Sequence, residues 1–382
     1  MTEPRLPAWQ NPAFVAVHCF ACEEPHDHHA PLTVCRACGL PLRVDYDHAR
    51  APLAPDALVG RPASLWRYRE VLPIRPEHAV SLVEGFTPLC GVADRLFVKD
   101  ESRNPTGSFK ARGLVMAVSL ARVLGAKVLS APSAGNAAGA LAAYGAAAKL
   151  PVVVAMPEDT PRAFIDECRH YGAEVHLTAG TIADAGKWLR EHGPRDTYDV
   201  STLKEPYRIE GKKTMAYELW EQLSGALPDV IIYPTGGGTG LVGMWKAFAE
   251  MRALGWAMPK TPRLVSVQMA GCAPVVRGFT EGAAATVPWQ DAKTRVWGLR
   301  VPSPIGGFLC LRAVRETGGT ALTVTEDEAG SATSRLAART GLDICPEGGA
   351  TYAAYEALRA QGAIADHETC VLFNTGTGLK YR

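Results

Sequence analysis

Short apolar runs that alternate with helical patterns constrain the fold of this chain more than any other feature. From about residue 96 onward each run is β-branched or aliphatic, and most runs precede a glycine-rich loop and a helix-like stretch. The runs are LFVK (96–99), KVLS (127–130), PVVVAM (151–156), EVHL (174–177), DVIIY (229–233), RLVSVQ (263–268) and CVLF (370–373). Repeated β–loop–α units build parallel sheets with helices on both faces. We therefore expect an α/β fold whose ligands bind beyond the carboxyl ends of the strands.

Composition and charge narrow the classes of partner. Hydrophobic residues make up 47% of the 382 residues, which is enough for a large core, and the net charge of +1 attracts neither nucleic acid nor an anionic membrane. The N-terminus MTEPRLPAWQ has no apolar core of a secretory signal, and Lys149 and Pro151 interrupt the apolar window 137–156. We expect a cytoplasmic protein without a membrane span that binds a small molecule.

Four of the ten cysteines form two CxxC pairs near the N-terminus, Cys19 with Cys22 and Cys35 with Cys38. Two such pairs supply four thiolates, which form a closed tetrahedral zinc site. Because a saturated site leaves no open coordination position, the predicted zinc is structural. The alternative is a set of reduced, metal-free cysteines.

The loop VKDESRNPTGSFKARG (98–113) places a lysine at the start of a helix. Asn104 to Gly107 form a turn signal, Ser108 is a good N-cap, and a helical pattern runs from Phe109 to Leu124. Lys110 then meets the positive end of the helix macrodipole, which should lower its pKa and favour the neutral amine that Schiff-base formation requires. The alternative is an ordinary surface lysine.

A second loop, PTGGGTG (234–240), follows the run DVIIY and precedes an apolar helical face. Its glycines let backbone N–H groups approach a ligand, so the loop predicts a phosphate cradle at a helix N-terminus. A Walker A loop is excluded because Gly-Lys-Ser/Thr is absent. A dinucleotide fingerprint is formally present, but the next run ends in Gln268 where a ribose-binding acid is expected.

Two further loops follow apolar runs. SAPSAGNAAG (130–139) offers a hydroxyl, amides and a carboxamide for a substrate carboxylate, unless its Ser and Asn simply cap the helix. FNTGTGLK (373–380) offers Thr375 and Thr377, whose hydroxyls suit the ring nitrogen of a heterocycle, unless the segment is only a terminal turn.

Together these loops resemble the tryptophan-synthase-like group of pyridoxal-phosphate (PLP) enzymes, fold type II, and most closely its threonine synthase branch. The resemblance covers about residues 80 to 381, and its most specific motifs are NPTGSFKARG and PYRIEGKKT (206–214). It implies a zinc-ribbon-like segment at 1–50, a large PLP-binding domain at 51–95 and 210–382, a small α/β domain at 96–209, and a homodimer.

The resemblance also implies roles for individual residues. Lys110 bonds covalently to PLP and later moves protons, and Asn136 hydrogen-bonds the cofactor's 3′ oxygen. Gly236, Gly237, Gly238, Thr239 and Gly240 bind the cofactor phosphate. Thr375 contacts the pyridine nitrogen and leaves it largely unprotonated, which suits elimination and replacement. Ser133, Ala134, Gly135, Asn136 and Arg208 bind the substrate, with Arg208 bidentate to a phosphate.

The chain departs from the threonine synthase pattern at several positions. The segment Ser133–Ala137 reads SAGNA where STGNT is usual, so two hydroxyls are missing, and Ala111 follows the lysine where Asp is common. These departures leave four hypotheses. They are a threonine synthase, a PLP-dependent β-eliminating lyase, dehydratase or replacement enzyme acting on serine, threonine or a related amino acid, a nucleotide-binding dehydrogenase, and a zinc-ribbon binding module without catalysis.

Overall fold

The computed structural model describes residues 6–382, and the chain divides into two compact units. Unit 1 contains the chain up to Gly85 together with Lys110–Thr214 and Glu250–Trp256. Unit 2 contains Phe86–Phe109, Met215–Ala249 and Ala257–Arg382. Helices α5 (Arg208–Gln222) and α6 (Thr239–Ala253) each run from one unit into the other.

Unit 1 holds two sheets. An N-terminal antiparallel sheet has the order β2-β1-β3, and a parallel sheet has the order β8-β7-β6-β9. The strands are β1 (Phe14–Cys19), β2 (Pro25–His26), β3 (Leu42–Tyr46), β6 (Val128–Pro132), β7 (Val152–Pro157), β8 (Glu174–Thr178) and β9 (Thr197–Asp199). The helices are α1 (Lys110–Val123), α2 (Asn136–Ala148), α3 (Arg162–His170) and α4 (Ile182–His192).

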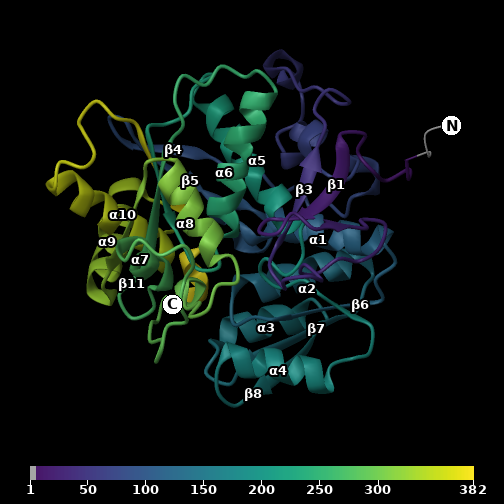
Figure 1. The fold of residues 1–382 in the computed structure, drawn as a ribbon. Helices are drawn as coiled ribbons and strands as arrows, with labels where there is room; N and C mark the ends of the chain where they lie inside the picture. The colour runs from purple at the N-terminus through teal and green to yellow at the C-terminus, as the bar shows by residue number, and fades with distance from the viewer. Residues whose placement is uncertain (1–5) are drawn as a thin grey trace. The chain divides into compact units, whose positions relative to one another are not determined.

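The central strand β7 shows why helices cover both faces of the parallel sheet (Figure 1). Its side chains alternate between the faces, and all of them are buried. Val152 and Val154 belong to the main core together with residues of α1 and α2, whereas Val153 and Ala155 pack against α4. The continuous apolar run VVVAMP therefore reflects burial on two sides.

Unit 2 is built on a six-stranded sheet of order β12-β11-β10-β13-β5-β4, in which only β4 is antiparallel to its neighbour. The strands are β4 (Leu89–Ala93), β5 (Leu96–Asp100), β10 (Val230–Pro234), β11 (Arg263–Met269), β12 (Thr320–Val324) and β13 (Cys370–Asn374). The helices are α7 (Pro274–Thr280), α8 (Gly307–Glu316), α9 (Glu326–Thr340) and α10 (Pro346–Ala360). One face of the sheet packs against α9 and α10, which lie side by side in Figure 1.

The predicted α/β fold with mostly parallel sheets is confirmed, and every predicted apolar run coincides with a strand that begins within one residue of it. The compact units group the chain differently from the expected domains. Residues 51–85 lie in unit 1, and β5 lies in unit 2 because it pairs with β13 and β4. No helix among the described residues has the length and apolar character needed to span a membrane.

Candidate active site

Three of the predicted loops leave unit 2 at the same edge of its sheet. Strands β10, β13 and β5 are consecutive and parallel, so their carboxyl ends lie together. The glycine loop follows β10, the NTGTG segment follows β13, and the loop that leads to Lys110 follows β5. The strand order therefore brings together segments that are far apart in the sequence.

Backbone hydrogen bonds fasten the loop after β5 to the segment after β13. The N–H of Phe109 donates to the carbonyl of Thr375 at 3.0 Å, and the N–H of Thr377 donates to the carbonyl of Gly107 at 2.8 Å. Ser108 and Gly376 form an antiparallel bridge between these two contacts. The residue that precedes Lys110 is thus fixed against the backbone of Thr375.

Lys110 lies in the first turn of α1, as expected, and is its first residue because the helix begins one residue later than predicted. Its side chain is partly exposed. Ser108 is extended and bridges Gly376. Because Lys110 begins α1, it lies at the positive end of the helix macrodipole.

Helix α1 crosses α5 at very short range, and the PYRIEGKKT motif makes this possible. A Cβ at Gly211 of α5 would lie 1.7 Å from the carbonyl oxygen of Arg112 in α1. The side chains continue the contact, because Arg112 Nη1 donates to the hydroxyl of Thr214 at 3.0 Å. The motif therefore packs against the helix whose first residue is Lys110.

A buried ionic cluster stabilises the same motif. Lys213 Nζ lies 2.6 Å from Glu210 and 2.9 Å from Glu250, and it stacks over the ring of Tyr46 at 3.9 Å. The hydroxyl of Tyr46 also donates to Glu210 at 2.8 Å. Lys213 of this motif is thus paired inside unit 1.

The glycine loop between β10 and α6 leaves backbone donors unused, and Gly236 and Gly238 in it are buried. Within the described chain, the amides of Gly236, Gly237 and Gly238 donate to no protein acceptor. Gly238 has a φ of +81°, and a Cβ there would lie 2.1 Å from the sulfur of Cys310. Buried N–H groups at a helix N-terminus without partners fit an anion such as a phosphate monoester.

The structure shows what Gln268 does at the position where a dinucleotide-binding protein would have an acid for the ribose. Its amide donates to the carbonyl of Thr235 at 2.9 Å, and its oxygen accepts the N–H groups of Val275 and Val276. The side chain is fully buried and ties the first residue of the glycine loop to the start of α7. Gln268 therefore supports the loop and is not positioned as a ribose ligand.

The two threonines after β13 differ in their surroundings. The hydroxyl of Thr377 donates to Asp343 and accepts the N–H of Leu379. Thr375 is 6% exposed, and its hydroxyl lies 3.9 Å from the sulfur of Cys345, which the sequence did not single out. Since Thr377 is engaged elsewhere, Thr375 is the better placed hydroxyl for a ligand at this strand end.

The predicted substrate residues lie in unit 1. Gly135 is the N-cap of α2, so neither Ser133 nor Asn136 occupies the N-cap position. Arg208 is 2% exposed and donates from Nη1 to the carbonyl of Val200 at 2.8 Å, while its Nε has no partner in the described chain. Burial lowers the pKa of Arg208, and burial, opposed by the charge of Arg208, raises the pKa of Glu205 to about 7.

The four predicted metal ligands converge. The sulfurs of Cys19, Cys22, Cys35 and Cys38 lie within 4.8 Å of one another, and three of the pairs are 3.4–3.6 Å apart. A tetrahedron with zinc–sulfur bonds of about 2.3 Å has sulfur–sulfur distances of about 3.8 Å. The amides of Ala21 and Ala37 donate to the sulfurs of Cys19 and Cys35 at 3.3 Å, and such N–H groups stabilise thiolates that bind a metal.

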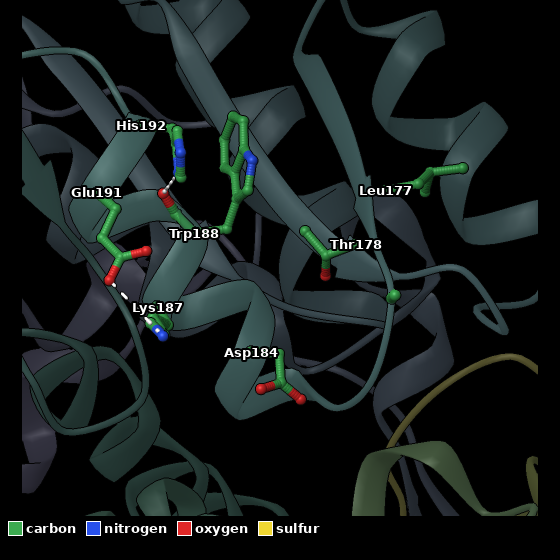
Figure 2. A pocket seen from close by; sticks show the side chains of 8 residues that line it. Leu177, Thr178, Asp184, Lys187, Trp188, Glu191 and His192 are labelled. Carbon is green, nitrogen blue, oxygen red and sulfur yellow. Dashed lines mark hydrogen bonds and ion pairs between the residues drawn. The ribbon is translucent and has the colours of Figure 1, made fainter.

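A surface hollow of about 390 Å³ is lined by residues of β8 and α4 and of the loop between them. Figure 2 shows Trp188 and His192 beside it, with Lys187 and Glu191 paired on the same helix. Trp188 stacks on both His176 and His192. None of the predicted cofactor or substrate residues lines this hollow.

Comparison with known proteins decides the family. Residues 80–376 match the model of the family described as pyridoxal-phosphate dependent enzyme. The chain belongs to this family.

Related proteins agree with the assignment of this PLP-dependent enzyme. The chain is 32% identical over 372 residues to a threonine synthase of Methanosarcina acetivorans. The matched region covers 95% of this chain and 91% of that relative. The chain is 31% identical to a threonine synthase of Methanocaldococcus jannaschii, covering 95% and 92%. The structure of maize serine racemase shares the fold, with a TM-score of 0.64, 20% identity, and coverage of 76% and 88%.

Proposed function

We propose that this enzyme is a threonine synthase, which converts O-phospho-L-homoserine and water into L-threonine and phosphate. The observation that carries the proposal is the similarity to threonine synthases over nearly the whole chain. The loops after β5, β10 and β13 support it, because each offers a group that PLP chemistry needs.

The proposed cofactor residues have separate tasks. Lys110 would hold PLP covalently, and the amides of Gly236–Gly240 would bind its phosphate. Asn136 would hydrogen-bond its 3′ oxygen, and Thr375 would contact its pyridine nitrogen. When bound, PLP supplies an electron sink for the bonds at the substrate's Cα. The amine of Lys110 then carries protons at Cα and Cβ, phosphate leaves from Cγ, and water adds at Cβ.

The proposed substrate residues offer hydrogen-bond donors. The N–H groups of Ala134, Gly135 and Asn136 precede or begin α2, where a carboxylate is stabilised. The unpartnered Nε of the buried Arg208 is the donor proposed for the substrate phosphate. A buried donor without a partner is costly, so an anionic ligand would lower the free energy of this arrangement.

The second candidate is a PLP-dependent enzyme that acts on serine, threonine or a related small amino acid. It would be either a β-eliminating lyase or dehydratase, or a β-replacement enzyme. The observation that favours it is the SAGNA segment, which lacks two hydroxyls of the usual threonine synthase loop. A lyase of this kind needs no second phosphate site.

One paired assay separates the two functions. O-Phosphohomoserine is supplied to the holoenzyme while inorganic phosphate and threonine are both measured. In parallel, serine and threonine are supplied while keto acid and ammonia are measured. We expect equal amounts of phosphate and threonine from the first assay. Keto acid from the second assay, with no phosphate release in the first, would establish the lyase instead.

We also propose that Cys19, Cys22, Cys35 and Cys38 bind one structural zinc ion. The sulfur geometry and the two N–H donors support this, and a four-sulfur site has no open position for a substrate. Such a site suits a reducing compartment, and we propose a cytoplasmic homodimer. Elemental analysis should find one zinc per chain, and sedimentation should find a dimer.

A further inference from the structure

The turn that precedes Lys110 contains a threonine in a backbone conformation that threonine rarely adopts. Thr106 has a φ of 59° and a ψ of 18°, which lie in the left-handed helical region. A β-branched residue is an outlier in this region, because its Cβ lies too close to the following carbonyl oxygen. The hydroxyl of Thr106 has no hydrogen-bond partner among the described residues, so the side chain does not compensate for the strain. The conformation must therefore be held by groups around the turn.

Two hydrogen bonds from the segment after β13 hold this turn. Nζ of Lys380 donates to the carbonyl of Thr106 at 2.7 Å, and the N–H of Thr377 donates to the carbonyl of Gly107 at 2.8 Å. The side chain of Thr377 also lies close to Gly107, where an added Cβ would be 2.8 Å from its methyl carbon. Lys380 therefore fixes the peptide group that directly follows the strained residue.

The backbone on both sides of Lys380 is itself anchored. The N–H of Gly378 donates to Asp343 at 2.9 Å, and the hydroxyl of Tyr381 donates to Glu347 at 2.8 Å. Asp343 lies just before α10, and Glu347 lies in the first turn of that helix. Because both of its neighbours are tied to α10, Lys380 reaches the turn from a fixed backbone.

The turn is connected to Lys110 by a short stretch of buried chain. Only Ser108 and Phe109 separate Gly107 from Lys110, and both are buried. A change in the conformation of Thr106 would therefore shift the residue that begins α1. A shift of about 1 Å in the position of a reacting group can lower a rate by about 100-fold. The conformation of the turn thus bears directly on where the lysine amine lies.

We propose that Lys380 is a positioning residue, which holds Thr106 in its left-handed conformation and thereby presents the amine of Lys110 to the cofactor. This inference rests on the proposed PLP site. Lys380 acts through the peptide group of Thr106 and not on the cofactor itself. Without its charged donor, the turn would relax toward the conformations that threonine prefers. A smaller fraction of molecules would then be ready to bind PLP.

The test measures the dissociation constant of PLP for the full chain, from the absorption of the bound cofactor at increasing PLP concentrations. Lys380→Met keeps a side chain of similar length but removes the donor. The left-handed region costs a residue with a Cβ about a tenfold loss in population, so the dissociation constant should rise about tenfold.

Two variants of the same segment control this result. Lys380→Arg keeps a cationic donor and should bind PLP as the wild type does. Leu379→Ala shortens a neighbouring side chain that is 69% exposed, and it should also leave the dissociation constant unchanged. A loss of affinity in Leu379→Ala as large as that in Lys380→Met would overturn the specific role of Lys380.

A substitution at Thr106 separates this role from a general structural one. Glycine adopts the left-handed region about as readily as the right-handed one, so in a Thr106→Gly background Lys380→Met should weaken PLP binding by no more than about twofold. If Lys380 stabilised the protein in a way unrelated to the conformation of Thr106, the loss would be equally large in both backgrounds. Equal losses would therefore overturn the inference.

Amide hydrogen exchange reports on the turn whether or not PLP is bound. The N–H groups of Gly107 and Phe109 are hydrogen-bonded, and Lys380→Met should make both exchange about tenfold faster. Unchanged exchange, or wild-type PLP affinity in Lys380→Met, would overturn the inference and leave the proposed function in place. A wild-type protein that binds no PLP would defeat the proposed function and the inference together.

Discussion

Replacing Gly211 with alanine should push α5 away from α1, the helix that begins with Lys110. The added Cβ would lie 1.7 Å from the carbonyl oxygen of Arg112 and 3.1 Å from Cγ of Met116. Both atoms belong to α1, and the oxygen is backbone, so no rotamer change can relieve the contact. Since nonbonded heavy atoms pack at about 3.5–4.0 Å, the helices must separate by more than about 1 Å.

The expected cost follows from two opposing effects. Overpacking a core costs about 1–3 kcal/mol, and a clash with backbone belongs at the upper end of that range. Alanine in place of glycine inside a helix stabilises the helix by about 1 kcal/mol. The net loss is about 2 kcal/mol, which lowers the melting temperature of a domain of about 150–250 residues by about 4–8 °C.

Thermal unfolding of the matched variant Gly330→Ala provides the control. Gly330 lies on the exposed side of α9, and a Cβ there would meet no atom within 4 Å. This substitution should raise stability by up to about 1 kcal/mol. Gly211→Ala should also retain less PLP, because the start of α1 moves. If Gly211→Ala stabilised the protein as Gly330→Ala does, the inferred helix contact would be refuted.

Three further predictions concern the cysteine cluster and two buried charged groups. A chelator that removes zinc should lower the melting temperature, and Cys22→Ser should be less stable than the wild type without any chelator. Because burial raises the pKa of Glu205 from 4.5 to about 7, the folded protein binds the extra proton and should lose stability as pH rises from about 4.5 through 7. The melting temperature of Glu205→Gln should depend less on pH over that range than that of the wild type. An equal dependence on pH in both proteins would contradict this. Lys213→Met leaves Glu210 and Glu250 buried without their cation and should cost about 3–5 kcal/mol in urea unfolding. A loss below about 1 kcal/mol would count against a buried ion pair.

Local pattern was enough to predict seven of the strands and the loops that follow them. The run VVVAMP of β7 is continuous because both of its faces are buried, and PTGGGTG marks the strand-to-helix turn after β10. The pairing of strands is nonlocal, so the sequence did not indicate that β5 lies between β4 and β13 in unit 2. The half-exposed β12 (TALTV) lacks a strong apolar run and was not predicted.

The supporting residues of the candidate site were harder to predict. Pro346 and Glu347 look like an ordinary helix start, with proline at N1 and an acid in the first turn. Only the neighbouring positions of α10 and the end of β13 reveal that Cys345 lies beside Thr375. Likewise, the sequence shows PYRIEGKKT as a motif, but only the structure shows that Gly211 must lack a side chain because the backbone of Arg112 lies so close to it.

Borohydride reduction of the purified holoenzyme, followed by peptide mapping, tests the assignment of Lys110 most directly. We predict a yellow protein that reduction bleaches, with the cofactor mass on the peptide containing Lys110. Lys110→Ala should give no covalent label and no turnover. A label on another lysine such as Lys99 or Lys212, or an active Lys110→Ala variant, would contradict the proposal that Lys110 holds the cofactor.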